Sequence, residues 1–446
     1  MSLFKAYDLR GKVPEDLNED IAYRIGAAYA NIYQPQKVVV GYDIRLESPG
    51  LAQALRNGLS DGGVDVLDIG LCGTEEVYFA TFHRQLDGGI MVTASHNPKG
   101  HNGMKLVGPE ARPISIDTGL RDIQQRVESG DIATSNPKGS VTSEHRKEEF
   151  IEHLLGYVDR SILRPMKILV NPGNGGAGLI IDELKEFLPF EFVELNMRPD
   201  GDFPQGVPNP LLVENQMATS EALRSSGAEL GIAWDGDFDR CFFFDSEGRF
   251  IDGYYLVGLL AEMMLLKAPK SKIVHDPRLI WNTQEQVDRS GGTALQSRCG
   301  HAFIKQIMRE EDAIYGGEMS AHHYFRDFSY CDSGMIPWLL IVEMICRSGK
   351  SMTELVEERM NAFPCSGEIN FRVENASESI EKVLNHYSDL DPDVDRLDGI
   401  SADFGDWRFN IRASNTEPLL RLNIESRGDT ALVENAVAEI SKMIGG

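Results

Sequence analysis

The feature that most constrains the fold is a strand, turn and helix arrangement that occurs three times. Each copy opens on an apolar run that ends in a turn, continues to a second strand candidate, and closes with a third strand candidate and a polar loop. The opening runs are "KVVVGYDIRLESPGL" (37–51), "MKILVNPGNGGAGLI" (166–180) and "SKIVHDPRLIW" (271–281). Val/Ile-rich runs alternating with helix-length segments are typical of α/β domains with largely parallel sheets. We therefore expect three similar α/β domains with mixed, largely parallel sheets.

The end of the chain has a different order of elements. Strand candidates "GEINFRVE", "DGISADF", "WRFNIRAS" and "LLRLNIE" are combined with helices expected near 377–388 and 430–444. This order predicts a C-terminal α+β domain. The expected domains are residues 1–155, 156–253, 254–363 and 364–446.

A polar loop follows the third strand of each α/β copy: "TASHNP" (93–98), "WDGDFDR" (234–240) and "GEMSAHH" (317–323). In open α/β sheets, ligands bind beyond the carboxyl ends of the strands. Equivalent loops of three packed domains can therefore converge on one cleft.

Composition limits the function classes. The 446 residues carry a formal net charge of -25, which repels phosphate polymers and argues against nucleic-acid or anionic-membrane partners. A small phosphorylated substrate remains compatible with this charge. The chain shows no apolar run of membrane-spanning length, and its six cysteines form no C-x-x-C pair. We expect a cytoplasmic protein with reduced thiols.

The second polar loop has the composition of a metal site. Asp235, Asp237 and Asp239 can place three hard oxygen ligands around one divalent cation. A calcium EF-hand is excluded because Arg240 and Ser246 stand where that loop needs glycine and glutamate. Mg²⁺ fits better, and an ordinary acidic turn is the alternative. The adjacent Arg240 favours a site that also receives an anion.

The first polar loop places Ser95 beside His96, His101 and Lys105. Taken alone, the string is typical of a turn closed by Asn-Pro and capped by the serine. The functional interpretation is a serine that accepts and returns a phosphoryl group, with the cationic neighbours stabilising charge. A hydrolase triad is disfavoured because no G-x-S-x-G surrounds Ser95.

Two further loops offer binding groups. Glu318 and Ser320 match vicinal sugar hydroxyls, although many polar loops would look similar. The string "RASNTEP" has the inventory of a phosphate monoester site, with an exposed loop as the alternative. Its candidate residues are Arg412, Ser414, Asn415 and Thr416.

The string "GNGGAG" (173–178) fits the G-x-G-x-x-G pattern of dinucleotide-binding folds, and Glu194 lies about 20 residues on, as that pattern requires. By itself it supports an NAD-dependent dehydrogenase. The other two copies lack these glycines at the same place, which favours a packing role within the repeat.

Taken in order, five strings resemble the bacterial α-D-phosphohexomutase superfamily, and most of all its phosphomannomutase branch. They are "FKAYDLRG" (4–11), the serine loop, the metal loop, "GEMSAHH" and "RASNTEP". The resemblance spans the whole chain.

The resemblance implies four domains around one central cleft and an enzyme that interconverts D-mannose 6-phosphate and D-mannose 1-phosphate for GDP-mannose synthesis. Ser95 would be phosphorylated in the resting enzyme, and Mg²⁺ would be held by its phosphate with Asp235, Asp237 and Asp239. A hexose 1,6-bisphosphate would be the intermediate and activator.

The family pattern also assigns other residues. It implies that Glu318 and Ser320 bind the sugar hydroxyls, and that "RASNTEP" binds the non-transferring phosphate. Lys105 and His301 would transfer protons. The remaining positions that match the lining of the family's cleft are Tyr7, Arg10, Arg240, Arg278 and His322.

Two residues depart from the family pattern. Phe238 stands at the second glycine of D-G-D-G-D-R, where positive φ would strain it, and Ala321 replaces a more usual glycine.

Met319, directly after Glu318, resembles the mannose-using branch of the family rather than the glucose-specific phosphoglucomutases. Dual mannose/glucose activity, a phosphoglucosamine mutase and a non-catalytic sugar-phosphate sensor remain alternatives, as do a monomer or a dimer. Closure of the C-terminal domain over the cleft is a further hypothesis.

Overall fold

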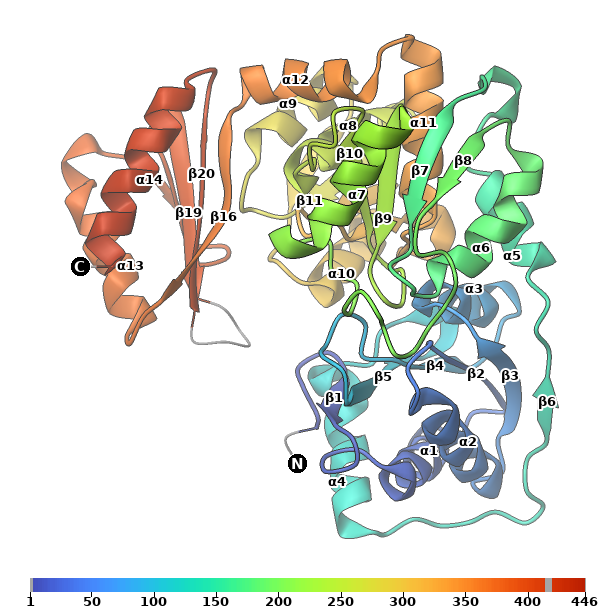
Figure 1. Cartoon of the computed structure of the whole chain (residues 1–446). Helices are drawn as coiled ribbons and strands as arrows, with labels where there is room; N and C mark the ends of the chain where they lie inside the picture. Colours follow the sequence, from blue (N-terminus) through green and yellow to red (C-terminus); the bar gives the residue numbers. More distant parts are fainter. Residues whose placement is uncertain (1–2, 414–418, 446) are drawn as a thin grey trace. The chain divides into compact units, whose positions relative to one another are not determined.

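The computed structural model describes residues 3–413 and 419–445 (Figure 1). The chain forms two compact units. The first consists of residues 1–250 and 327–347, and the second of residues 251–326 and 348–446. Each unit has its own sheets and hydrophobic clusters.

The first sheet of the first unit has the order β1-β5-β4-β2-β3-β6. β2 runs parallel to β3 and β4, whereas β5 is antiparallel to β1 and β4. The strands are β1 (Leu9–Lys12), β2 (Lys37–Tyr42), β3 (Asp65–Leu71), β4 (Gly88–Val92), β5 (His101–Val107) and β6 (Val141–Ser143).

Helices cover both faces of this sheet (Figure 1). Val38 and Val40 of β2 pack into the cluster formed with α1, α2 and α4, while Val39 faces the α3 cluster. This alternation is the two-residue period of a strand buried on both faces. The helices are α1 (Glu19–Tyr33), α2 (Ser48–Asp61), α3 (Thr74–His83), α4 (Arg121–Ser129), and the short turns η1 (Pro109–Ala111) and η2 (Ile116–Leu120).

The second sheet of the first unit has the order β10-β9-β7-β8. β7 is parallel to β8 and β9, and β10 is antiparallel to β9. Its strands are β7 (Lys167–Asn171), β8 (Glu191–Glu194), β9 (Leu230–Trp234) and β10 (Cys241–Asp245). The accompanying helices are α5 (Glu148–Leu155), η3 (Arg160–Ile162), α6 (Ala177–Leu184), η4 (Lys185–Phe187), α7 (Val213–Ser226) and α11 (Ile336–Ser348).

The second unit contains a sheet in which β12, β11, β13 and β14 are neighbours in that order. β11 is parallel to β12 and β13, and β14 is antiparallel to β13. The strands are β11 (Lys272–His275), β12 (Thr293–Gln296), β13 (Tyr315–Gly317) and β14 (His323–Phe325). The helices are α8 (Gly253–Lys267), α9 (Trp281–Arg289), α10 (His301–Glu311) and α12 (Met352–Ala362). Two short elements, η5 (Arg326–Phe328) and β15 (Cys331–Asp332), follow β14 in the chain.

The C-terminal sheet is antiparallel, with the order β16-β20-β19-β18-β17. Helices α13 and α14 lie together on one face (Figure 1), over a core that includes Phe409, Leu422 and Ile440. The elements are β16 (Cys365–Arg372), α13 (Ala376–His386), η6 (Ser388–Leu390), β17 (Asp393–Asp395), β18 (Ile400–Asp403), β19 (Trp407–Ala413), β20 (Leu419–Ser426) and α14 (Thr430–Gly445). The predicted α+β character is confirmed.

The predicted repeat is also confirmed, and the strand order makes it explicit. In each of the three α/β sheets the first strand of the copy lies between the second and the third: β4-β2-β3, β9-β7-β8 and β13-β11-β12. The third strand always continues through its polar loop into an antiparallel return strand, β5, β10 or β14. These return strands were not predicted, because the polar loops interrupt the apolar pattern. Among the described residues, no helix is both long and apolar enough to span a membrane.

Candidate active site

One buried arginine, Arg45, binds the backbone of the serine loop. Arg45, 2% exposed, donates through Nη2 to the carbonyl oxygens of Ser95 at 2.8 Å and Asn97 at 2.5 Å. Its Nη1 donates to the carbonyls of Pro98 at 3.1 Å and His101 at 3.0 Å. A planar guanidinium can bind four acceptors in this way because its donors form a fixed fork. The loop is therefore preorganised, with Ser95 at φ 47°.

A second layer fixes Arg45 and the backbone of the serine. The carboxylate of Asp43 accepts hydrogen bonds from the backbone N–H of Arg45 at 3.0 Å and from Thr93 Oγ1 at 2.7 Å. Thr93 Oγ1 in turn accepts the N–H of Ser95 at 2.8 Å. Sequence reasoning missed Arg45, although "GYDIR" marks it at the turn of the first repeat.

The hydroxyl of Ser95 faces the metal loop. Its Oγ donates to Asp235 Oδ2 at 2.8 Å and lies 3.1 Å from Nδ1 of His96. Arg240 contacts both neighbours, through Nε to Asp235 Oδ2 at 3.0 Å and through Nη2 to His96 Nδ1 at 2.7 Å. Since arginine can only donate, Nδ1 of His96 is an acceptor and the ring proton sits on Nε2.

Burial lowers the pKa of His96 well below its ordinary value, and the positive charges of Arg240 and Arg10 lower it further. The imidazole beside Ser95 is therefore neutral at physiological pH. Arg10 reaches the same loop, donating through Nη1 to the carbonyl of Ala94 at 3.2 Å and to the side-chain oxygen of Asn97. Tyr7 lies just ahead of β1 and is partly exposed.

The three aspartates of the metal loop follow β9 and are buried, with exposed fractions of 0% for Asp235 and Asp237 and 2% for Asp239. Each offers a carboxylate oxygen within 4.8 Å of the other two, as a single cation would require. None of the described residues hydrogen-bonds to Oδ1 of Asp237, which is buried. A buried carboxylate oxygen without a donor fits a metal ligand.

Lys105 provides the positive charge at this cluster. Its Nζ lies 2.8 Å from Asp237 Oδ2 and also contacts Asp239 Oδ2. Burial would lower the pKa of Lys105, but Asp237 and Asp239 outweigh it and hold the pKa above its usual value. Burial likewise opposes ionisation of Asp237, yet Lys105 and hydrogen bonds including that of Thr74 hold its pKa below the ordinary range. Lys105 and Asp237 therefore form a charged pair near neutral pH.

The sugar loop in the second unit turns tightly between β13 and β14. The Glu318 carboxylate accepts hydrogen bonds from Tyr324 Oη at 2.6 Å and from the Gly300 N–H at 3.0 Å. Gly300 immediately precedes His301, the first residue of α10, so this hydrogen bond ties the start of that helix to the sugar loop. The ring of His322, in the same loop, stacks on that of Tyr324 at 6.2 Å between centroids.

Three arginines of the second unit share one carboxylate. Glu368 receives Arg278 at 3.3 Å, Arg412 at 3.2 Å and Arg421 at 3.3 Å. Burial would raise the pKa of Glu368, but the three guanidinium groups lower it overall. Arg278 also donates to Asp276 at 2.7 Å and to Ser320 Oγ at 3.5 Å, which links the cluster to the sugar loop.

The phosphate loop is described only in part. Nε of Arg412 is buried, and no described residue accepts its proton. Ser414, Asn415 and Thr416 lie outside the described residues. Glu368 and Arg421 were missed by sequence reasoning, because nothing in "GEINFR" or "LLRLNIE" distinguishes a charged site residue from a strand's exposed face.

Both departures from the family pattern occur at left-handed backbone positions. Phe238 has φ 47° and Ala321 has φ 70°. Side chains at such positions are strained relative to glycine. The strain expected for Phe238 is therefore present, and Ala321 adopts the same kind of backbone conformation.

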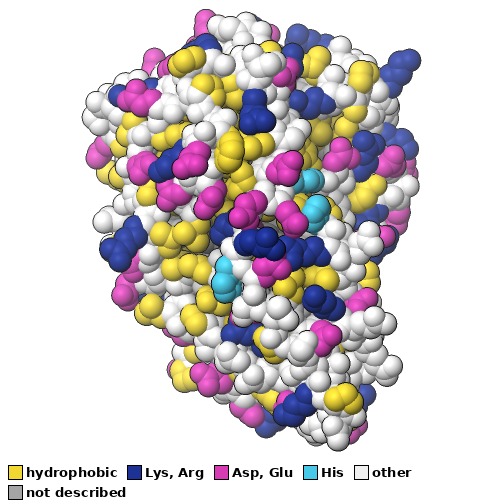
Figure 2. Space-filling model, turned by 90° about the vertical axis from the view of Figure 1, so that its right-hand side faces the viewer, with side chains coloured by type: hydrophobic (Ala, Val, Ile, Leu, Met, Phe, Trp, Pro, Cys, Tyr) yellow, Lys and Arg dark blue, Asp and Glu magenta, His cyan; other side chains and the backbone are white. Residues whose placement is uncertain are grey.

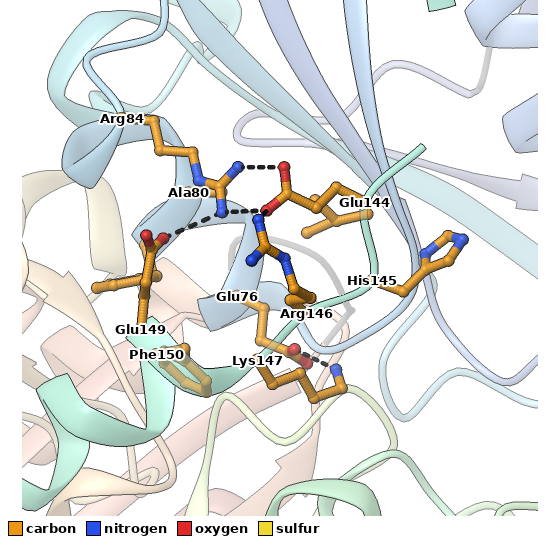
Figure 3. A pocket seen from close by; sticks show the side chains of 11 residues that line it. Glu76, Ala80, Arg84, Glu144, His145, Arg146, Lys147, Glu149 and Phe150 are labelled. Atoms are coloured by element: carbon orange, nitrogen blue, oxygen red, sulfur yellow. Dashed lines mark hydrogen bonds and ion pairs between the residues drawn. The ribbon is translucent and has the colours of Figure 1, made fainter. Parts of the chain in front are cut away.

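Over the face shown in Figure 2, acidic and basic side chains are interspersed with hydrophobic ones, without one sign dominating. A separate small cavity, about 30 Å³, lies between α3 and the segment leading to α5 (Figure 3). Its charged lining groups pair with one another, as Arg84 does with Glu144 at 2.8 Å and Glu149 at 3.0 Å. These ion pairs connect the end of α3 to α5 and to the segment before it.

Comparison with known proteins gives matches along the whole chain. Domain profiles described as "Phosphoglucomutase/phosphomannomutase, alpha/beta/alpha" domains I, II and III match residues 1–133, 148–248 and 252–363, and the corresponding C-terminal domain matches residues 368–443. A protein of Xanthomonas campestris pv. campestris named "Phosphohexose mutases" is 60% identical over 443 residues, covering 99% of each chain.

A phosphomannomutase of Salmonella montevideo is 56% identical over 451 residues, which cover 100% of this chain and 99% of the relative. Among solved structures, a phosphoglucomutase/phosphomannomutase family protein of Burkholderia thailandensis superposes with a TM-score of 0.89 at 31% identity, covering 100% of this chain and 98% of that one.

Proposed function

The chain belongs to the phosphoglucomutase/phosphomannomutase family, and on that premise we propose that it is a phosphomannomutase interconverting D-mannose 6-phosphate and D-mannose 1-phosphate. Members of this family are enzymes that move a phosphoryl group between positions of a sugar. The observation that carries the proposal is the Ser95 hydroxyl, 2.8 Å from Asp235 at the three-aspartate loop.

We propose that Ser95 carries the phosphoryl group. In the first half-reaction the bond between phosphorus and Ser95 Oγ breaks, and a bond forms from phosphorus to a hydroxyl oxygen of the hexose monophosphate. The resulting hexose 1,6-bisphosphate then returns its other phosphoryl group to Ser95 Oγ, which releases the isomer. Arg10, Arg240 and Lys105 supply the positive charge that the phosphoryl oxygens need.

Proton transfer is assigned to Lys105 and His301. The sugar hydroxyl that attacks must lose a proton, and Ser95 Oγ must gain one when it is released. Lys105 is protonated in its contact with Asp237 and Asp239, so it begins the cycle as a proton donor. His301, at the start of α10, is the proposed partner.

Asp235, Asp237 and Asp239, with the phosphate of Ser95, would hold Mg²⁺. The three buried carboxylates support this assignment, as does Oδ1 of Asp237, to which no described residue donates a hydrogen bond. When bound, Mg²⁺ supplies positive charge next to the phosphoryl oxygens.

Recognition of the hexose phosphate is assigned to the second unit. Glu318, Ser320 and His322 would bind the sugar hydroxyls. The non-transferring phosphate would be bound by Arg278, Arg412, Ser414, Asn415 and Thr416, and Tyr7 of the first unit is a further proposed substrate contact. The convergence of three arginines on Glu368 supports this division.

We also propose domains with boundaries at residues 155, 253 and 363, and a cytoplasmic enzyme whose partners are small hexose phosphates rather than nucleic acids or membranes. The strongly negative net charge supports the choice of partner. Mannose 1-phosphate made in this way would feed GDP-mannose synthesis.

A second candidate is dual activity on mannose and glucose phosphates. It is favoured by the name of the Xanthomonas relative, which is not restricted to mannose. The test is to compare kcat/KM for mannose 1-phosphate, glucose 1-phosphate and glucosamine 1-phosphate. A clear preference for mannose supports the main proposal, similar values for mannose and glucose support dual activity, and a preference for glucosamine contradicts both.

A further inference from the structure

The phenylalanine of the metal loop has an unusual combination of properties. Phe238 is fully buried, with 0% exposure, and its backbone adopts φ 47°. A bulky side chain rarely adopts this conformation, and it persists only where the surroundings compensate for the strain. Phe238 also lies between two proposed metal ligands, Asp237 and Asp239. The surroundings of the ring therefore bear directly on the metal loop.

The ring sits against two glycines. A Cβ atom at Gly73 would lie 2.1 Å from Cζ of Phe238, and a Cβ at Gly176 would lie 2.9 Å from Cε1. The backbone does not itself demand glycine at either position, because φ is -97° at Gly73 and -74° at Gly176. The need for glycine at both sites comes from the space that the ring occupies.

These glycines are the N-cap residues of α3 and α6. At the start of each helix, one backbone N–H donates a hydrogen bond to a carbonyl oxygen of the metal loop. The N–H of Thr74, the first residue of α3, donates to the carbonyl of Asp237 at 3.2 Å. The N–H of Gly176, ahead of α6, donates to the carbonyl of Gly236 at 3.2 Å. Thr74 Oγ1 also donates to Asp237 Oδ2 at 2.5 Å.

The start of α3 is held in place by Glu76, which Figure 3 shows paired with Lys147. The Glu76 carboxylate accepts the N–H of Gly73 at 2.9 Å and is paired with Lys147. Gly73 cannot retreat from the ring without breaking this capping interaction. The space that the Phe238 ring occupies between Gly73 and Gly176 is therefore fixed on the side of Gly73.

We propose that Phe238 is a positioning residue whose ring, seated between Gly73 and Gly176, holds the metal loop so that Asp237 and Asp239 converge on the cation. The proposal shares its metal site with the proposed function, and it depends on the proposed reaction only for its activity readout. It also assigns the "GNGGAG" turn a role: Gly176 makes room for a side chain of the metal loop rather than for a dinucleotide.

The effects of substituting Phe238 and Gly73 on cation affinity should not be additive. Phe238→Ala should weaken divalent-cation binding about tenfold to a hundredfold, the usual effect of losing a residue that orients metal ligands. Gly73→Ala should cause a similar loss, because the added methyl group displaces the ring. In the double variant the methyl group no longer meets the ring, so its loss should equal that of Phe238→Ala alone.

The experiment is a double-mutant cycle on the purified enzyme. Mn²⁺ affinity is measured by electron paramagnetic resonance and Mg²⁺ affinity by calorimetry, with kcat and KM for mannose 1-phosphate and thermal melts alongside. Phe187→Ala, which removes a phenylalanine that is 50% exposed, is the matched control. We expect weaker metal binding and lower kcat in both single variants, with KM for the sugar unchanged.

Additive losses in the double variant, or unchanged metal affinity in Phe238→Ala, would overturn the proposal. If Phe238→Ala does not fold, Phe238→Leu replaces it in the cycle. Metal affinity should then fall by less than in Gly73→Ala, and an affinity equal to that of the wild type would contradict the role of the ring volume. An inactive wild-type enzyme whose metal affinity still follows the expected cycle would refute the proposed function and leave the positioning role standing.

Discussion

The two charged sites of the molecule differ in how their charges are balanced. At the serine and metal loops of the first unit, each aspartate already has a cationic partner: Lys105 for Asp237 and Asp239, and Arg240 for Asp235. In the second unit, three arginines share the single carboxylate of Glu368. At the first site each carboxylate of the metal loop is thus paired with a cation, whereas at the second three guanidinium groups converge on one glutamate, with Arg278 also paired to Asp276.

This difference matches the different tasks we propose for the two units. Chemical groups that must transfer a phosphoryl group benefit from a fixed geometry, which internal ion pairs and the hydrogen bonds of Arg45 provide. A site that binds an anion benefits from guanidinium groups whose mutual repulsion a phosphate relieves. Changes in the first unit should therefore act on kcat, and changes in the second on KM.

The largest expected effect is that of Ser95→Ala. Loss of the proposed phosphoryl carrier should lower turnover about 10⁴-fold or more, as for other essential nucleophiles. Calorimetry should still detect mannose 6-phosphate binding, because the arginines of the second unit are unchanged. Ser225→Ala, at an exposed serine of α7, is the control. Near-normal turnover in Ser95→Ala would contradict the assignment.

Arg412→Met tests the other side of the comparison. Its Nη2 binds Glu368 and its Nε has no acceptor among the described residues, so it has donors to offer a phosphate. Losing hydrogen bonds to a charged ligand should raise KM about tenfold to a hundredfold with a smaller effect on kcat. Arg396→Met, at an arginine that is 61% exposed on its side chain, serves as control. A fall in kcat at unchanged KM would reverse the division of roles.

Arg45→Lys sharpens the comparison within the first unit. A lysine keeps the charge but cannot reach four carbonyl oxygens with a fixed fork, so the serine loop should lose its rigid geometry. We expect kcat to fall about tenfold with KM unchanged, as is usual when positioning is lost. Arg224→Lys, at an exposed arginine that donates to the Glu247 carbonyl, is the control. Steady-state kinetics on both variants decide the matter, and a change in KM alone would count against a positioning role.

The smallest effect concerns pH and lies outside both sites. Burial lowers the pKa of His153 to about 4, and the charge of His83 contributes. The unfolded chain, with an ordinary histidine pKa of about 6.5, then binds more protons than the folded chain, so stability falls as pH drops from about 6.5 toward 4. Its ring packs among Phe79, Phe82 and Tyr157, which a phenylalanine could imitate.

His153→Phe should therefore reduce the loss of Tm between pH 7 and pH 5 by a few degrees, without changing kcat or KM at pH 7. His145→Phe, at an exposed histidine of the same unit, is the control. Melting curves at the two pH values provide the check. An unchanged pH dependence would mean that His153 is not neutral in the folded protein.

Much of this could be predicted from the sequence. The serine, metal and sugar loops were found because polar residues follow the third strand in each repeat, which places them at the carboxyl edge of a sheet. Arg45, Glu368 and Arg421 escaped detection, since their roles depend on carbonyls and charges distant in sequence. The seat of Phe238 was equally hidden, because Gly73 and Gly176 belong to separate turns.

The central claim is that Ser95 carries a phosphoryl group on behalf of the sugar. Mass spectrometry of the peptide containing Ser95, before and after incubation with excess mannose 1-phosphate or mannose 6-phosphate, tests it most directly. We predict a phosphoryl group on that residue in the purified enzyme and its loss on incubation. A peptide that is never phosphorylated, although the enzyme turns over at a normal rate, would contradict the mechanism.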